Sequence, residues 1–119
     1  MANDLLQEKG LSFAIRCVNL MKILNERHEF IISKQMMRSG TSIGANISES
    51  QSAQSDMDYI SKLSISLKEA QETKYWFDLL YRTDYIDEQE YTSMYNDVKE
   101  MIAMLTTLIK SKKQKLGIV

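Results

Sequence analysis

The amino-acid sequence predicts an all-α protein, a single antiparallel up-down-up-down four-helix bundle over residues 1–119. The chain has no proline and only four glycines, and residues that favour helix are common. Apolar residues recur at spacings of three and four in four stretches, and short polar breaks separate these stretches. A chain of this length can bury one core without a metal or a disulfide. We expect helices at about 11–26, 29–50, 56–82 and 88–113.

Charge and cysteine content limit the classes of function. The 15 basic and 16 acidic residues leave a formal charge of −1, which argues against coating nucleic acid or membrane through bulk charge. The single cysteine, Cys17, cannot form an internal disulfide, and residues 1–10 are polar where a secretory signal would be apolar. No apolar run approaches the roughly 20 residues that span a bilayer. We therefore expect a cytoplasmic protein with no membrane contact.

The first helix is predicted from Leu11 onward, because residues 1–10 show no clear period and are expected to form a tail or a loose first turn. A helix with one apolar stripe packs on one side. The stripe consists of Leu11, Ala14, Ile15, Val18, Met21 and Leu24. The polar cluster 25–29 ends this helix, and so short a connection makes the next helix run back antiparallel.

The second helix begins near Glu29 or Phe30 and carries a ridge of small residues, Gly40, Gly44 and Ser48, at spacings of four. Its apolar positions are Phe30, Ile32, Met36, Ile43 and Ile47. Glycine inside a helix costs about 1 kcal/mol relative to alanine, so the ridge indicates close contact with another helix. We expect the third helix to lie against it. The alternative, a hinge or a phosphate-cradling loop, needs a preceding strand, and none is predicted.

Asn46 lies in the middle of the second helix. We expect it to be at least partly buried and to form a hydrogen bond with a polar group of the third helix such as Ser64. A lone asparagine in a helical core fixes the register of the paired helices. The alternative is an asparagine side chain at the surface.

The third helix is predicted over 56–82, where Ser55 and Asp58 resemble a capping box. Its inner face consists of Ile60, Leu63, Leu67, Ala70, Phe77 and Leu80. Tyr75 and Trp76 are adjacent and cannot share one face of the helix. One of the two is therefore expected to point outward, as large aromatic residues at interfaces do.

The fourth helix has the clearest start, with Asp87 as N-cap, Glu90 at the third helical position and Ile86 placed to pack on Tyr91. Its apolar positions are Tyr91, Met94, Tyr95, Val98, Met101, Ile102, Leu105, Leu108 and Ile109. This pattern is typical of a bundle helix with one broad buried face. Acidic residues at the start and lysines at the end agree with the helix dipole.

No set of residues predicts catalysis. His28 is the only histidine and falls in a predicted turn, whereas Cys17 lies nearly three turns earlier, so no base is placed beside the thiol. Di-iron bundles use Glu-x-x-His motifs, and the pair Glu69 and Glu72 lacks the imidazole. We expect no catalytic residue, no metal, no cofactor and no small-molecule substrate.

Basic residues at two places are candidate nucleic-acid contacts: Lys34, Arg38, Lys110, Lys112, Lys113 and Lys115. The first two lie one turn apart on the second helix, and the four lysines follow the last acidic residue of the chain. One interpretation is a patch that contacts phosphates. The other is compensation of the helix dipole together with a solvated tail.

The segment 38–49, Arg-Ser-Gly-Thr-Ser-Ile-Gly-Ala-Asn-Ile-Ser-Glu, resembles the signature of the bacterial 23S rRNA intervening-sequence proteins. Segments 58–60, 64–70 and 72–76 resemble their second signature, and segment 13–16 extends the similarity into the first helix. The resemblance implies a four-helix bundle of this length. It also implies a homopentameric barrel, as in the related accessory variability proteins of diversity-generating retroelements, which assist a reverse transcriptase and contact nucleic acid.

Two functions are therefore expected, and neither is enzymatic. The first is a self-associating scaffold, a pentamer by resemblance, that acts as an accessory in a process involving RNA or a nucleic-acid enzyme. The alternative is a protein-binding helical adaptor with no nucleic-acid role. Many family members carry basic residues just after the first signature, whereas segment 50–54 has no charge, and this departure favours the adaptor.

Overall fold

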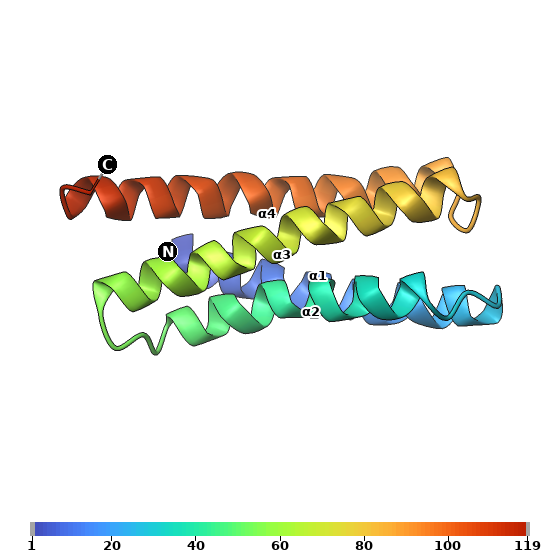
Figure 1. The fold of residues 1–119 in the computed structure, drawn as a ribbon, viewed down its shortest axis with the longest axis horizontal. Coiled ribbons are helices and arrows are strands. Elements are labelled where there is room, and N and C mark those ends of the chain that lie inside the picture. Colours follow the sequence, from blue (N-terminus) through green and yellow to red (C-terminus); the bar gives the residue numbers. More distant parts are fainter. Residues whose placement is uncertain (1, 119) are drawn as a thin grey trace.

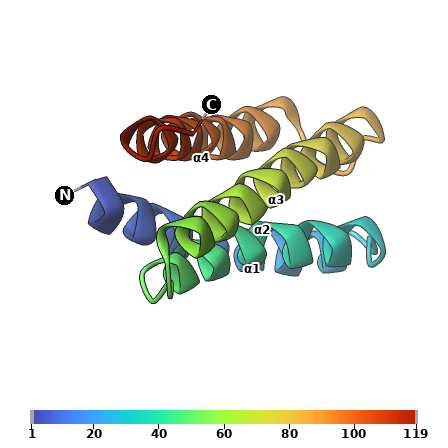
Figure 2. The same cartoon turned by 60° about the vertical axis from the view of Figure 1, so that its left-hand side comes forward.

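The computed structural model describes residues 2–118, with side chains from residue 4 onward. Its elements are α1 (Ala2–Glu26), α2 (Ile32–Ser50), α3 (Asp56–Arg82) and α4 (Glu88–Lys115). The helices run alternately up and down in a rod of 48 × 23 × 22 Å (Figure 1). Turned by 60°, the rod shows α3 passing from α2 to α4, with α1 beside α2 (Figure 2). The predicted all-α bundle is confirmed.

All four helices contribute to one core. Phe13 of α1 meets Phe77 of α3 edge to face, with ring centroids 6.1 Å apart. Other fully buried side chains of this core are Leu24, Met36, Ile43, Ile47, Leu63, Leu80, Val98 and Leu105. Because these residues come from every helix, each element depends on the others for the burial of its apolar face.

The predicted caps of α3 and α4 follow local rules. The Asp87 carboxylate accepts a hydrogen bond from the Glu90 amide at 2.8 Å, and the Glu90 carboxylate accepts one from the Asp87 amide at 2.9 Å, which confirms the capping box. Ser55 caps α3 by accepting from the Asp58 amide at 3.0 Å. The Asp58 side chain accepts from the amide of Gln54, not from that of Ser55, so the second half of that box is shifted by one residue.

The prediction that residues 1–10 form a tail is wrong for the described residues, because α1 begins at Ala2. Met1 lies outside the described residues. Leu6 is only 1% exposed, and Gly10 is buried against α2. These residues lack a regular apolar period, and contacts with other helices hold them instead. At the other end, α4 extends to Lys115, two residues past its predicted end.

The second helix begins at Ile32, not at residue 29, because Glu29 acts as its cap. The buried Glu29 carboxylate accepts hydrogen bonds from the amides of Ile31, Ile32 and Ser33 at 3.2, 3.1 and 2.6 Å. A carboxylate at this position compensates the positive end of the helix dipole. Phe30 was expected on the apolar face, but the turn directs it outward and it is 58% exposed.

Candidate interaction surfaces

The apolar stripe predicted for the first helix is largely a surface feature. Leu11 and Ile15 are 58% and 54% exposed, and Ala14 and Val18 are half-buried. The residues of α1 that enter the core are Leu6, Phe13, Cys17, Leu20 and Leu24. Only Leu24 belongs to both sets, so the predicted stripe is corrected. Helix α1 is apolar on two faces, and its neighbours cover one of them.

The uncovered face of α1 has the spacing of a coiled-coil seam. We call it the outer seam of α1, and it consists of Asp4, Glu8, Leu11, Ile15, Val18 and Lys22, spaced alternately by four and three. This alternation keeps residues in line along a helix that packs on another helix. The seam is acidic at its start, apolar in its middle and basic at its end. None of its charged residues forms an ion pair with the described part of the chain.

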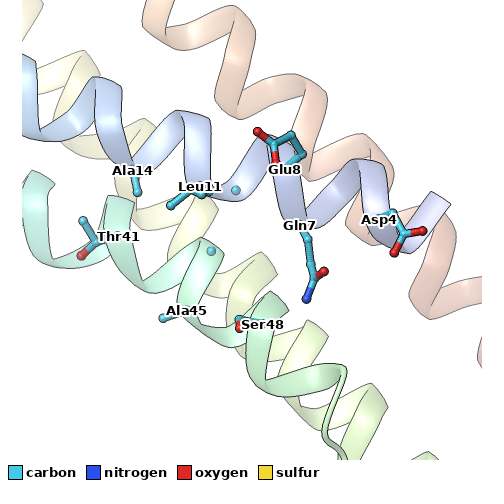
Figure 3. Close-up of a pocket in the computed structure, with 10 residues that line it drawn as sticks. Asp4, Gln7, Glu8, Leu11, Ala14, Thr41, Ala45 and Ser48 are labelled. Atoms are coloured by element: carbon cyan, nitrogen blue, oxygen red, sulfur yellow. The ribbon is translucent and has the colours of Figure 1, made fainter. Parts of the chain in front are cut away.

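A groove of about 440 Å³ runs beside this seam, between α1 and α2. Its walls include Ala14 and Leu11 on one side and Thr41, Ala45 and Ser48 on the other. Figure 3 shows the side chain of Gln7 in the space between the two helices, near Ser48. The groove extends the apolar middle of the outer seam onto α2.

The glycine ridge of α2 makes the predicted close contact, but with α1 and not with α3. A Cβ atom on Gly44 would lie 2.9 Å from the backbone C and O atoms of Gly10. One on Gly40 would lie 2.5 Å from the Cys17 sulfur. Ser48, the third residue of the ridge, is exposed and lines the groove. The sequence showed that a helix must approach here, but the partner depended on how all four helices are arranged.

Hydroxyl groups, not glycines, mediate the contact between α2 and α3. The buried Ser66 hydroxyl donates to the carbonyl oxygen of Ile43 at 2.8 Å, and the Thr73 hydroxyl donates to the Ser39 hydroxyl at 2.8 Å. The sequence analysis did not single out these residues. The signal available in the sequence was that these small polar residues occupy positions of the helical period that are expected to be buried.

Asn46 does not join α2 to α3. Its side-chain amide donates to the carbonyl oxygen of Ser42, one turn earlier in the same helix, at 2.9 Å. Asn46 is half-buried, and its expected partner Ser64 is exposed. The predicted register bond is therefore corrected. At a helix edge, an asparagine side chain reaches the carbonyl four residues back more readily than a neighbouring helix.

The six candidate nucleic-acid contacts divide between different parts of the rod. Lys34 lies near the start of α2 and the lysines of α4 lie at the opposite end (Figure 1). Arg38 forms ion pairs with Glu69 and Glu72 of α3. Of the lysines at the end of α4, Lys112 pairs with Asp56 at 2.9 Å and lies over the ring of Tyr59. The remaining three, Lys110, Lys113 and Lys115, form no ion pair with described residues.

Cys17 and His28 have different surroundings, because Cys17 is buried and His28 is exposed. Burial raises the pKa of the Cys17 thiol to about 12. His28 is exposed in the α1–α2 turn, where its ring meets that of Phe30 edge to face. Within residues 2–118, no three His, Cys, Asp or Glu side chains lie in a group that could hold a metal ion. No helix in the described part of the chain has the length and apolar character needed to cross a membrane.

Comparison with known proteins gives the family. The sequence model of the 23S rRNA-intervening sequence protein matches residues 4–107. No curated protein matches the chain. A crystal structure of a protein of unknown function from the S23 ribosomal protein family of Bacteroides thetaiotaomicron is 53% identical. The match covers 92% of this chain and 99% of that chain, with a TM-score of 0.91. The chain belongs to the 23S rRNA-intervening sequence protein family.

Proposed function

We propose that the protein is a non-enzymatic helical scaffold that associates with copies of itself and acts as an accessory in a cytoplasmic nucleic-acid process linked to RNA or reverse transcription. The observation that carries the proposal is the outer seam of α1. Leu11 and Ile15 each expose more than half of their surface, although the opposite face of the same helix is buried in the core. A helix that is apolar on both faces is typically covered on both.

The energetic case rests on the apolar middle of the seam. Full burial of a leucine, isoleucine or valine side chain contributes roughly 1.5–3 kcal/mol. Leu11, Ile15 and Val18 are already partly covered, so their further burial contributes a fraction of this amount on each copy. The neighbouring groove adds the apolar surface of Ala14 and Ala45. The sum over two copies is large enough to offset part of the cost of association.

The charges of the seam favour a second copy as the partner. Asp4 and Glu8 lie at one end of the seam and Lys22 at the other, and each is exposed. A second copy that runs antiparallel along the seam places its Lys22 beside Asp4 and Glu8. The number of copies, five by resemblance to the accessory variability proteins of diversity-generating retroelements, is part of the proposal.

Light scattering of the full chain tests self-association. We expect a mass that is a multiple of 13.8 kDa for the unchanged protein. The double substitution Leu11→Glu and Ile15→Glu should give a monomer with unchanged helix content by circular dichroism. Met57→Glu, at a residue of α3 that is 59% exposed, is the matched control and should keep the mass. A monomeric unchanged protein at high concentration would contradict the proposal.

The adaptor function remains the second candidate. The uncharged segment 50–54 and the engagement of Arg38 by Glu69 and Glu72 both reduce the charge available to phosphates on α2. In that case the outer seam binds another protein. Absence of RNA binding at low salt, together with a monomeric mass, would favour the adaptor over the scaffold.

A further inference from the structure

We infer that the outward face of α3 and α4 binds a single-stranded nucleic acid. The inference rests on the proposed function and gives its nucleic-acid partner a location. We call this surface the α3–α4 basic face, and it consists of Lys68, Lys74, Arg82, Lys99 and Lys110. Of these five residues, the sequence predicted only Lys110 as a nucleic-acid contact. The net charge of −1 does not show where on the molecule the charges lie.

Most of the cations outside this face form ion pairs with carboxylates. On α1, on α2 and in the turn between them, carboxylates pair with most basic residues: Glu100 with Lys9, Asp97 with Arg16, Glu90 with Arg27, and Glu69 and Glu72 with Arg38. Within the described part of the chain, no residue of the α3–α4 basic face forms an ion pair. Four of the five are exposed, and Lys74 is half-buried.

Several acidic residues near the face already have partners. Glu69 and Glu72 pair with Arg38 on the α2 side of α3. The Asp78 carboxylate accepts a hydrogen bond from the Tyr91 hydroxyl at 2.5 Å. The acids in the middle of α4, Asp97 and Glu100, turn to the opposite side of the helix, toward α1. The five cations of the face outnumber the carboxylates near them in the chain, Asp78, Asp84 and Glu88, and this excess of positive charge attracts phosphates.

The contact between Lys74 of α3 and Tyr95 of α4 shows which residues of the two helices lie at the same height along the bundle. The Lys74 ammonium lies 5.5 Å from the centre of the Tyr95 ring. Lys68 is six residues before Lys74, and Lys99 is four residues after Tyr95. Because α3 and α4 are antiparallel, both lie on the same side of this contact, about 9 Å and about 6 Å along their helices. Lys68 and Lys99 thus lie at similar levels on the two helices, where both can contact one phosphate backbone.

Aromatic rings accompany these cations. Tyr75 follows Lys74 in the chain, and its side chain is 59% exposed. The rings of Tyr81 and Tyr91 stack with centroids 4.5 Å apart, and Tyr95 continues the row. Bases stack on exposed aromatic rings only when they are unpaired, and cations track the backbone of the same strand. The combination therefore fits a single strand better than a duplex, which would use the cations alone.

Fluorescence anisotropy with a labelled single-stranded RNA of about 20 nucleotides tests the face, with a series of salt concentrations for each variant. Lys68→Gln with Lys99→Gln should lower the magnitude of the salt slope by about 1.4, since each phosphate contact with a single strand contributes about 0.7. Lys9→Gln with Lys62→Gln, at lysines that pair with Glu100 and Glu49, is the matched control and should leave the slope unchanged.

Stacking is tested separately. Tyr75→Ala should weaken binding roughly 5-fold to 150-fold without changing the salt slope, because one stacked base contributes about that factor. Phe30→Ala, at the exposed aromatic residue of the α1–α2 turn, is the control and should bind as the unchanged protein does. A duplex RNA of the same length should not respond to Tyr75→Ala. Lys68, Lys99, Tyr75 and Phe30 are exposed, and circular dichroism verifies that each variant folds.

The possible results separate the inference from the proposed function. If the unchanged protein binds RNA but both pairs of lysine substitutions lower the slope equally, the location on α3 and α4 is overturned and the nucleic-acid role stands. If Tyr75→Ala binds the single strand as tightly as the unchanged protein, the choice of a single strand is overturned. If the unchanged protein binds no RNA at low salt, both the face and the nucleic-acid role fall, whereas self-association is measured independently by light scattering.

Discussion

The Thr73 hydroxyl donates a hydrogen bond to the Ser39 hydroxyl oxygen at 2.8 Å, in the contact of α3 with α2, where both residues are fully buried. The Ser39 hydroxyl in turn donates to the carbonyl oxygen of Met36 at 3.3 Å. The Thr73 oxygen also lies 2.8 Å from the carbonyl of Glu69, which offers its proton a second acceptor. Two hydroxyl groups thus join two helices and leave neither polar atom unsatisfied.

A double-mutant cycle measures this link. Thr73→Val and Ser39→Ala should each lower the free energy of unfolding by about 0.5–1.5 kcal/mol. The two changes together should cost less than their sum by about 0.5–1.5 kcal/mol, because the residues share one hydrogen bond. Urea denaturation at neutral pH gives the three differences. Strictly additive effects would show that the bond contributes nothing to stability.

The contact of Gly44 with Gly10 gives a second prediction. Gly44→Ala should lower the free energy of unfolding by roughly 1–3 kcal/mol, because the new methyl group meets the Gly10 backbone at 2.9 Å. The cost of this clash should exceed the roughly 1 kcal/mol by which alanine is favoured over glycine inside a helix. Gly40→Ala meets the Cys17 side chain instead, so Cys17→Ala should relieve part of its cost. Denaturation of the single and double variants tests both, and relief of Gly44→Ala by Cys17→Ala would contradict the geometry.

Cys17 predicts a pH dependence in alkaline solution. Burial raises the pKa of its thiol from 9.0 to about 12, so the folded state keeps a proton that the unfolded chain loses. The free energy of unfolding should therefore fall as the pH rises from about 9 toward 12, by at most about 1.4 kcal/mol per pH unit. Cys17→Ala should lack this component. Comparing the two proteins between pH 8 and 10 largely avoids the titration of Tyr91, whose pKa is also raised.

Glu90 predicts the opposite behaviour in acid. A bidentate hydrogen bond from Arg27, at 2.9 Å to each carboxylate oxygen, holds the pKa of Glu90 below its ordinary value of 4.5. The stabilisation is present above pH 4.5 and is lost as the pH falls through the lowered pKa. Glu90→Gln should therefore melt below the unchanged protein at pH 7 and approach it near pH 3. Glu88→Gln, at an exposed carboxylate outside any ion pair of the described residues, is the control and should show no such convergence.

Features set by near neighbours in the chain could be predicted from the sequence. The bounds of α3 match the predicted 56–82, and the cap formed by Asp87 and Glu90 has the expected bonds. Both depend on groups within four residues of each other, so a local pattern carries the information. The four helices follow for the same reason, since a helical period of apolar residues needs no knowledge of the partner.

The tertiary structure decided which faces these helices bury and which they leave exposed. Two apolar stripes compete on α1, and the core takes the one with Phe13 and Cys17 while the one with Leu11 and Ile15 stays at the surface. The same arrangement turns Gly44 toward α1. The same holds for charge. The composition gives the net charge of the chain, but which cations form ion pairs depends on which helices meet. A one-dimensional period records how far residues are apart along a helix and not what lies across from them, so the candidate surfaces emerged only from packing.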